Sequence, residues 1–287
     1  MSPPPVLPQQ PVPLNDQQIA LTERYLLPMQ QALFDYMMAL RLEVDERLAP
    51  HLPPMLGKPY PLGRCLEINN AVIAALVKRL GNPTHPMEKV IVDFLRQGGI
   101  IRPIWGALRG RYFQNAMQFG SLYVDASNDT VTVTKPKIEI LPMDQSGMES
   151  IRDAAHFAEI AAIYWGATIY ANVATPSLAP ILPFISFIPA TYPVLQSATD
   201  YMIELLMRDG FRSARHWLET APAPPPDVWA QLRGRVPADL MAADPDSGRQ
   251  AAITACDAMA ETGRRLDMDW RDARVQDYLR IRQGAVG

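Results

Sequence analysis

Cys65 is the residue with the clearest chemical potential, and it stands in the stretch Tyr60 to Ile68, YPLGRCLEI. A loop that contains Pro and Gly precedes it, so the sequence predicts that Cys65 lies in the first turn of a helix. Backbone N–H groups at a helix N-terminus favour a thiolate and lower the pKa of a cysteine. Cys65 is therefore a candidate nucleophile; the alternative is a small buried residue beside Leu66 and Ile68.

A second stretch, GSLYVDASND from Gly120 to Asp129, carries the acidic candidate Asp125. Gly120-Ser121 is typical of a two-residue hairpin turn, which pairs Phe119 with Leu122 and sets Ala116 opposite Asp125. Alternation then gives a core face and a polar face that is solvated or part of a site. The core face carries Phe113, Met117, Phe119, Leu122 and Val124, and the polar face carries Tyr112, Gln114, Gln118, Tyr123 and Asp125.

Taken together, these stretches resemble the transglutaminase-like branch of the papain-type cysteine enzymes. The resemblance covers Tyr60 to Asp129, with a helix that opens at Cys65 and breaks at Gly81-Asn82-Pro83 before the hairpin. It implies a cysteine-dependent amide or acyl hydrolase or transferase acting on a peptide or amide substrate. By the same resemblance, Asp125 would orient a base on the first strand, and Gln114 beside it would donate to the developing oxyanion.

The first strand departs from that family pattern because it offers Arg111 to Gln114 where a histidine is expected. None of these side chains is an efficient base for a thiol at neutral pH. Either catalysis has been lost or a base comes from His85, in NPTHP, or from His156, on a helix. The alternatives are a loop-exposed role for His85 and a hydrogen-bonded core or helix-surface role for His156.

The chain as a whole predicts a helix-rich α+β fold with a short antiparallel meander of three to four strands packed against the helix that starts at Cys65. The expected divisions are a disordered Pro-rich tail (1–14), a main α+β domain (15–220), a Pro-rich spacer (221–226) and a helical appendage (227–287). Expected helices span 15–47, 64–80, 147–173 and 196–218, with further helices after Pro86, in 249–266 and in 270–282. Expected strands span 112–119, 122–126, 130–134 and 138–141.

Composition excludes several classes of function. A formal net charge of -3 provides no broad attraction to phosphate backbones, so we expect no nucleic-acid partner. The two cysteines, Cys65 and Cys256, form no CxxC pair and favour a reducing, cytoplasmic location. No nucleotide or zinc-peptidase motif is present, so no cofactor is expected. Four carboxylates could hold a hard cation, but their spacing indicates a solvated surface instead; they are Glu139, Asp144, Glu149 and Asp153.

Residues 160–199 contain no charged side chain and five prolines. A helix that ends before Pro176 offers roughly 15 apolar residues, about 22 Å, which is short of the roughly 30 Å of a bilayer core. We therefore expect buried helix and loop, with membrane-surface contact as a lesser alternative. The competing, non-enzymatic hypothesis is a helical interaction protein that holds a protein partner through Thr175 to Pro193 and the C-terminal tail. A third is a small-molecule pocket behind the polar strand face.

Overall fold

A computed structural model describes residues 6–55, 57–196 and 199–284. These residues divide into two compact units, each described here by itself. The N-terminal unit is Gln9–Ser150, and the C-terminal unit begins at Ile151 and includes the described residues before Gln9. The chain therefore divides at residues 150–151 instead of at the Pro-rich segment 221–226.

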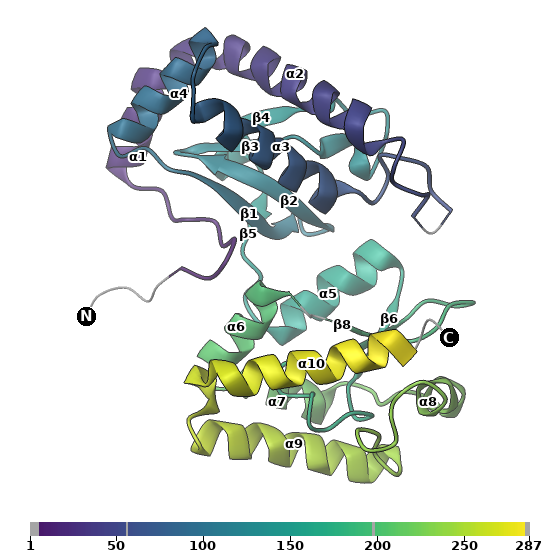
Figure 1. The fold of residues 1–287 in the computed structure, drawn as a ribbon. Coiled ribbons are helices and arrows are strands. Elements are labelled where there is room, and N and C mark those ends of the chain that lie inside the picture. The colour runs from purple at the N-terminus through teal and green to yellow at the C-terminus, as the bar shows by residue number, and fades with distance from the viewer. Residues whose placement is uncertain (1–5, 56, 197–198, 285–287) are drawn as a thin grey trace. The chain divides into compact units, whose positions relative to one another are not determined.

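The N-terminal unit contains four α-helices followed by a five-stranded antiparallel sheet (Figure 1). This combination of helices with an antiparallel sheet, among the described residues, confirms the helix-rich α+β class that the sequence predicts. The helices are α1 (Asp16–Tyr25), α2 (Gln30–Leu48), α3 (Cys65–Leu80) and α4 (Pro86–Arg96). The strands are β1 (Ile101–Leu108), β2 (Tyr112–Phe119), β3 (Leu122–Asp125), β4 (Glu139–Pro142) and β5 (Met148–Glu149).

Local sequence signals fix where these helices begin and end. Asn15 caps α1 by accepting a hydrogen bond from the backbone N–H of Gln18. The long helix expected over 15–47 is interrupted at Pro28, where a short 3₁₀ turn (Leu27–Met29) separates α1 from α2. His85 caps α4 in a reciprocal capping box with Glu88.

The sheet has the strand order β4-β3-β2-β1-β5. Phe119 pairs with Leu122, as the Gly120-Ser121 turn predicts. Gly120 has a φ of 57°, and an added Cβ would lie 2.3 Å from Thr22 Oγ1, so both conformation and space require glycine there. The predicted strands 112–119 and 138–141 are confirmed to within one residue, and β3 ends one residue before the predicted limit.

Two parts of the strand prediction are wrong. Residues 130–134 form no strand, because the chain makes a 3₁₀ turn at Asn128–Thr130 and continues through turns. Strand β1 was not expected, since Pro103 and Gly106 obscure its alternation. Gly106 is required by packing, because an added Cβ would lie 2.2 Å from the carbonyl oxygen of Glu149 on β5.

The two faces of this sheet bury different sets of side chains. Helices α2, α3 and α4 share one apolar cluster with Met117, Phe119, Leu122 and Val124. A smaller cluster on the other face contains Ile104, Leu108, Ala116, Tyr123 and Met143. The face that was expected to be polar is therefore buried as well, and its polar side chains have to find partners inside the protein.

The C-terminal unit combines six α-helices with a three-stranded antiparallel sheet in the order β6-β7-β8, counted over the described residues. Its helices are α5 (Ala154–Trp165), α6 (Asp200–Arg208), α7 (Arg212–Thr220), α8 (Pro226–Arg233), α9 (Pro245–Glu261) and α10 (Met268–Gly284). Its strands are β6 (Thr168–Ala171), β7 (Phe184–Phe187) and β8 (Val194–Gln196). The helices expected over 147–173 and 196–218 are shorter, because Gly166 and Gly210 adopt positive φ and end or break them.

The uncharged region 160–199 lies mostly inside the C-terminal unit. Leu178, Ile181, Phe184 and Ile185 are each at most 1% exposed. In the second half of this region, the exposed residues that the structure describes are 189–192, Val194 and Thr199. Most of the proposed partner surface Thr175 to Pro193 is therefore core. Among the described residues, no helix is both long and apolar enough to cross a membrane.

The two Pro-rich segments are built into the fold where the structure describes them. Within 221–226, Ala221 is buried and the carbonyl oxygen of Pro222 accepts a hydrogen bond from Ala171 on β6. In the expected tail, Leu7 is buried, and Val12 exchanges two backbone hydrogen bonds with the side chain of Gln118. Residues 1–5 of that tail lie outside the described residues.

Candidate functional site

Cys65 is the first residue of α3, and α3 packs directly on β2. Ile68, Val72 and Leu76 of this helix share the apolar cluster that contains Met117 of β2. The loop before Cys65 is held by a hydrogen bond from the N–H of Gly63 to the carbonyl oxygen of Thr130, at 2.9 Å. The predicted helix start is confirmed, and it sets the thiol against the middle of the sheet.

The partner of the Cys65 sulfur is Asn115 on β2. Asn115 Nδ2 lies 3.5 Å from Cys65 Sγ, and the thiol is half-buried. Burial raises the pKa of the Cys65 thiol, while the side-chain and backbone hydrogen bonds from Asn115 act to lower it. The net direction is opposite to the lowered pKa that the sequence predicts for a cysteine at a helix N-terminus, and desolvation is its largest cause.

Sequence reasoning missed Asn115. The residue lies two positions before Met117 on β2, so strict alternation sets it on the sheet face that α3 covers. Because asparagine is polar, Asn115 was not included in the predicted core face. A polar residue inside an apolar alternation, opposite a helix that begins with cysteine, was the signal that could have found it.

Asp125, the candidate orienting acid, is the last residue of β3 and has no exposed surface. Its oxygens accept hydrogen bonds from Gln114 Nε2 at 2.8 Å, Tyr123 OH at 3.0 Å and the N–H of Ser127 at 2.7 Å. Desolvation raises the pKa of Asp125 to about 6, although these hydrogen bonds act to lower it. The hydrogen bonds to this carboxylate that the structure describes all come from neutral donors, although the charge of Arg109 also interacts with it.

Asp125 and Cys65 do not share a hydrogen bond. The Asp125 side chain contacts Gln114 and Tyr123, on the face opposite the one that α3 covers. The connection between the two runs through Ser127, whose Oγ lies 3.0 Å from Asp125 Oδ1 and 3.1 Å from the carbonyl oxygen of Asn115. The carboxylate nevertheless lies near enough that its charge also raises the pKa of Cys65.

Gln114, the expected oxyanion donor, uses its amide hydrogens inside this network. Its Nε2 donates to Asp125 and contacts both Oγ and the carbonyl oxygen of Ser127. Its Oε1 is buried without a hydrogen-bond partner among the described atoms. In this arrangement Gln114 supports the carboxylate, and Asn115 is the amide that donates to the sulfur.

The two candidate histidines lie in other surroundings. His85 follows the C-terminal end of α3, whereas Cys65 opens it, and a helix of this length spans roughly 24 Å. His85 caps α4 and packs on the ring of Tyr36. His156 belongs to α5 of the C-terminal unit, where its Nδ1 accepts a hydrogen bond from the N–H of Arg152. Among the described residues, no imidazole donates to or accepts from Cys65 Sγ.

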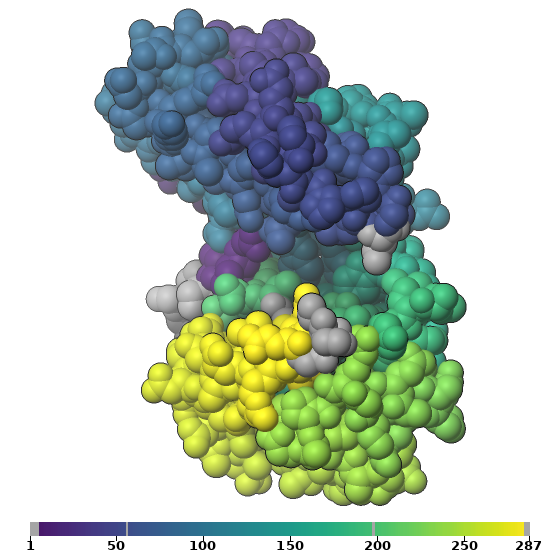
Figure 2. Space-filling view, turned by 45° about the vertical axis from the view of Figure 1, so that its right-hand side comes forward, coloured from purple at the N-terminus to yellow at the C-terminus, as the bar shows by residue number. Residues whose placement is uncertain are grey.

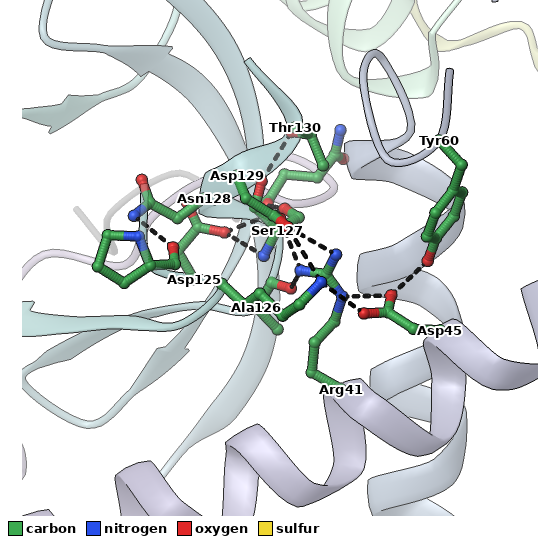
Figure 3. Close-up of polar contacts among 12 residues, drawn as sticks. Arg41, Asp45, Tyr60, Asp125, Ala126, Ser127, Asn128, Asp129 and Thr130 are labelled. Carbon is green, nitrogen blue, oxygen red and sulfur yellow. Dashed lines mark hydrogen bonds and ion pairs between the residues drawn. The ribbon is translucent and has the colours of Figure 1, made fainter. Parts of the chain in front are cut away.

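A buried ion cluster holds the loop that follows Asp125 (Figure 3). Arg41 of α2 has no exposed surface and forms a two-pronged pair with Asp129, at 2.8 and 3.1 Å. Its Nη1 also donates to the carbonyl oxygen of Ala126 at 2.7 Å, and its Nε donates to Asp45 at 2.7 Å. Lys137 Nζ lies 2.8 Å from Asp45 and 3.3 Å from Asp129, and the Tyr60 hydroxyl also bonds Asp45.

This cluster positions both halves of the site. Arg41 fixes the start of the 126–130 loop through Ala126, which immediately follows Asp125. The end of the same loop binds the chain before Cys65, through Thr130 and Gly63. A fully buried arginine thus ties the carboxylate end of β3 to the thiol end of α3.

The structure supports no metal centre in this region. Among the described residues, no group of three or more His, Cys, Asp or Glu side chains could hold a metal ion. The site as described holds a largely protonated thiol beside an amide donor. A buried carboxyl group, that of Asp125, accepts hydrogen bonds from neutral donors on the opposite face of the sheet.

Comparison of the chain with protein-family models, with curated proteins and with solved structures found no match in any of the three.

Proposed function

We propose that the N-terminal unit is a degenerate thiol centre of the transglutaminase-like kind, which binds an acyl or amide group at Cys65 without turning it over at neutral pH. The observation that carries this proposal is the 3.5 Å contact between Asn115 Nδ2 and Cys65 Sγ. An amide stands where an enzyme of this kind needs a base.

The chemistry of acyl transfer explains why this substitution matters. The attacking species is a thiolate, which forms when a neighbouring base removes the thiol proton. The Asn115 amide has no titratable nitrogen in the working pH range, and burial keeps the pKa of Cys65 raised. Asp125 does not replace the base, because its oxygens are occupied by Gln114, Tyr123 and Ser127.

The same groups suit recognition of a carbonyl oxygen. Asn115 donates to the sulfur, and the first turn of α3, which Cys65 opens, has backbone N–H groups without partners inside the helix. A half-buried thiol adds a small apolar contact. A peptide or side-chain amide that enters with its carbonyl oxygen toward these donors is the ligand class that this chemistry favours.

Restoring the base tests the loss of turnover. We expect Asn115→His to speed acylation of Cys65 by 4-nitrophenyl acetate about a hundredfold at pH 7, the usual gain from a positioned general base. In that step the sulfur attacks the ester carbonyl, a thioester forms and 4-nitrophenolate leaves, which is followed by absorbance. The matched controls are Asn115→Gln, which keeps an amide, and Asn115→His combined with Cys65→Ala, which removes the nucleophile.

Two outcomes would overturn the proposal. Wild-type acylation at pH 7 as fast as that of Asn115→His would show that a base already serves Cys65. For the binding half, N-acetylglutaminyl-glycine amide should shift the NMR signals of the Asn115 side-chain amide in a saturable manner. A titration without any shift would contradict recognition of an amide at this centre.

A non-enzymatic role through Thr175 to Pro193 has less surface available than the sequence predicts. Tyr192 is 56% exposed and Val194 is 37% exposed, and the Arg235 guanidinium lies 3.2 Å from the centre of the Tyr192 ring. That contact already covers part of the exposed aromatic ring. A partner surface of greater extent has to be sought elsewhere in the described residues.

A further inference from the structure

A groove lies between α2 and α3 on the helical side of the N-terminal unit. Figure 2 draws this part of the chain in purple to blue. Its cavity volume is about 710 Å³. Three small side chains of α3 and one larger apolar side chain of α2 contribute its apolar lining: Ala71, Ala74, Ala75 and Leu48. Its polar lining consists of three cationic side chains, one carboxylate and two neutral side chains: Arg47, Lys78, Arg79, Glu43, Asn82 and Thr84.

The charges around the groove are unbalanced. Arg47, Lys78 and Arg79 contribute three positive charges, against one negative charge from Glu43. Arg79 pairs with Glu43, so that positive charge is already compensated. Arg47 and Lys78 form no ion pair with any described residue. A protein with a net charge of -3 therefore displays two uncompensated cations beside an apolar groove.

The apolar lining is suited to a helix. Alanines at positions 71, 74 and 75 follow the i, i+3, i+4 spacing of one helix face, and exposed Val77 continues α3 at i+3 from Ala74. Small side chains let a third helix approach closely, at the interaxial distances of 8–10 Å that are usual for packed helices. The incoming helix would supply the larger apolar side chains that this surface lacks.

We propose that this groove binds an amphipathic helix of a partner protein that presents leucine-like side chains flanked by Glu or Asp. The argument rests on charge complementarity between acidic flanks and the uncompensated Arg47 and Lys78, together with the apolar lining. A nucleic acid would find a mostly apolar floor and only two free cations there. This inference is independent of the thiol centre, which uses other residues of α3.

A designed peptide tests the proposal on the full-length chain. The probe is a fluorescein-labelled helix of about 18 residues, long enough to cover α3, with leucines on one face and Glu on both flanks. Its matched control replaces every Glu by Lys. We expect saturable binding of the Glu peptide by fluorescence anisotropy and at least tenfold weaker binding of the Lys peptide. Binding of the Glu peptide should weaken as salt is raised.

Variants of the groove sharpen the assignment. The double variant Arg47→Glu with Lys78→Glu should reverse the preference between the two peptides. Ala74→Phe, at an exposed helix position that tolerates a larger side chain without disturbing the core, should fill the groove and abolish binding. The control is Lys89→Glu with Arg96→Glu on α4, which makes the same change of charge away from the groove and should leave binding unchanged.

Several results would overturn the proposal. Equal affinity for both peptides, or an unchanged preference in the charge-reversed variant, would contradict charge complementarity. Self-association in analytical ultracentrifugation that Ala74→Phe abolishes would assign the groove to a second copy of this chain. Binding of anionic lipid vesicles, lost in the charge-reversed variant and without binding of the Glu peptide, would assign it to a membrane surface.

Discussion

Two buried polar clusters meet at the 126–130 loop, and they hold their carboxylates in different ways. In the Arg41 cluster, Asp45 and Asp129 each lie beside a cation. In the cluster beyond Ala126, Asp125 is held by the neutral donors of Gln114, Tyr123 and Ser127. The pKa values diverge accordingly. Burial acts to raise the pKa of both Asp45 and Asp125, but Lys137, Tyr60 and Arg41 lower that of Asp45 overall, whereas that of Asp125 rises to about 6.

The difference separates a structural role from a titratable one. A carboxylate that is paired with cations stays charged throughout the physiological range, so the Arg41 cluster fixes the geometry of the loop at any working pH. A carboxylate that receives only neutral hydrogen bonds in a dry site can change its protonation near neutrality. Arg41 therefore holds the loop at both Ala126 and Asp129, while Asp125, immediately before the loop, can respond to pH.

The largest effect is expected from breaking the ion cluster. Arg41→Met leaves Asp129 buried with only the more distant Lys137 as a counterion, so the free energy of unfolding of the N-terminal unit should fall by about 3–5 kcal/mol. Hydrogen exchange of β2 and β3 peptides in increasing urea reports on this unit specifically. Arg96→Met is the control, since its exposed pair with Asp93 should cost less than about 1 kcal/mol. A similar loss in both variants would show that Arg41 is not a specific anchor.

The pH dependence of stability tests the opposite side of the comparison. The unfolded Asp125 carboxyl group loses its proton near pH 3.8, whereas the folded one keeps it to about pH 6. Between these values the folded state binds more protons, so the free energy of unfolding contributed by Asp125 decreases as the pH rises from 4 to 7. The difference in pKa corresponds to about 3 kcal/mol over that interval.

Asp125→Asn should remove this contribution. The variant should lose about 3 kcal/mol less than the wild type between pH 4 and pH 7, measured by the same exchange experiment at each pH. Asp93→Asn on α4 is the matched control, because it makes the same chemical change at a carboxylate that is 59% exposed. If Asp125→Asn and the wild type lose stability in parallel, the neutral-donor environment does not raise the pKa of Asp125.

These clusters show how far the sequence predicts the site. The helix start at Cys65 and the register at Phe119 and Leu122 follow from local signals, the Pro and Gly loop and the Gly-Ser turn, and both are confirmed. The buried surroundings of Asp125 were not predicted. Alternation along a strand says which residues share a face, but it does not say whether a second layer of protein covers that face.

Arg41 and Asn115 show why the remaining parts of the site could not be predicted from the sequence. Arg41 binds Asp129, which lies 88 positions away in the sequence. An arginine on an amphipathic helix is normally expected to be exposed to solvent. Asn115 contradicts the pattern of the strand face on which it lies, so a periodicity argument discards it. Contacts that depend on long-range packing and polar residues that violate the local pattern are the parts of a site that a single sequence does not reveal.

A smaller effect is expected at the link between the thiol and the carboxyl group. Ser127→Ala removes the hydroxyl that lies within hydrogen-bond distance of the Asn115 carbonyl oxygen and Asp125 Oδ1, so it should cost about 1–2 kcal/mol and raise the pKa of Asp125 further. The steepest part of the pH dependence described for the wild type should move to higher pH. Ser121→Ala, whose hydroxyl binds no described residue, should leave both quantities unchanged. If Ser127→Ala changes neither the free energy of unfolding nor its pH dependence, the loop keeps its geometry without this bridge.

The smallest effect should be a change in rate at the sulfur. The side-chain hydrogen bond from Asn115 lowers the pKa of Cys65, so Asn115→Ala should raise that pKa and slow alkylation by iodoacetamide about fivefold at pH 8, as expected for the loss of a hydrogen bond worth about 1 kcal/mol. Mass spectrometry of the Cys65 peptide measures the rate, with buried Cys256 as an internal standard and exposed Asn70→Ala as the matched variant. Faster alkylation would mean that Asn115 chiefly shields the sulfur, and the contrast between a neutral-donor centre and an ion-paired anchor would then apply to Asp125 alone.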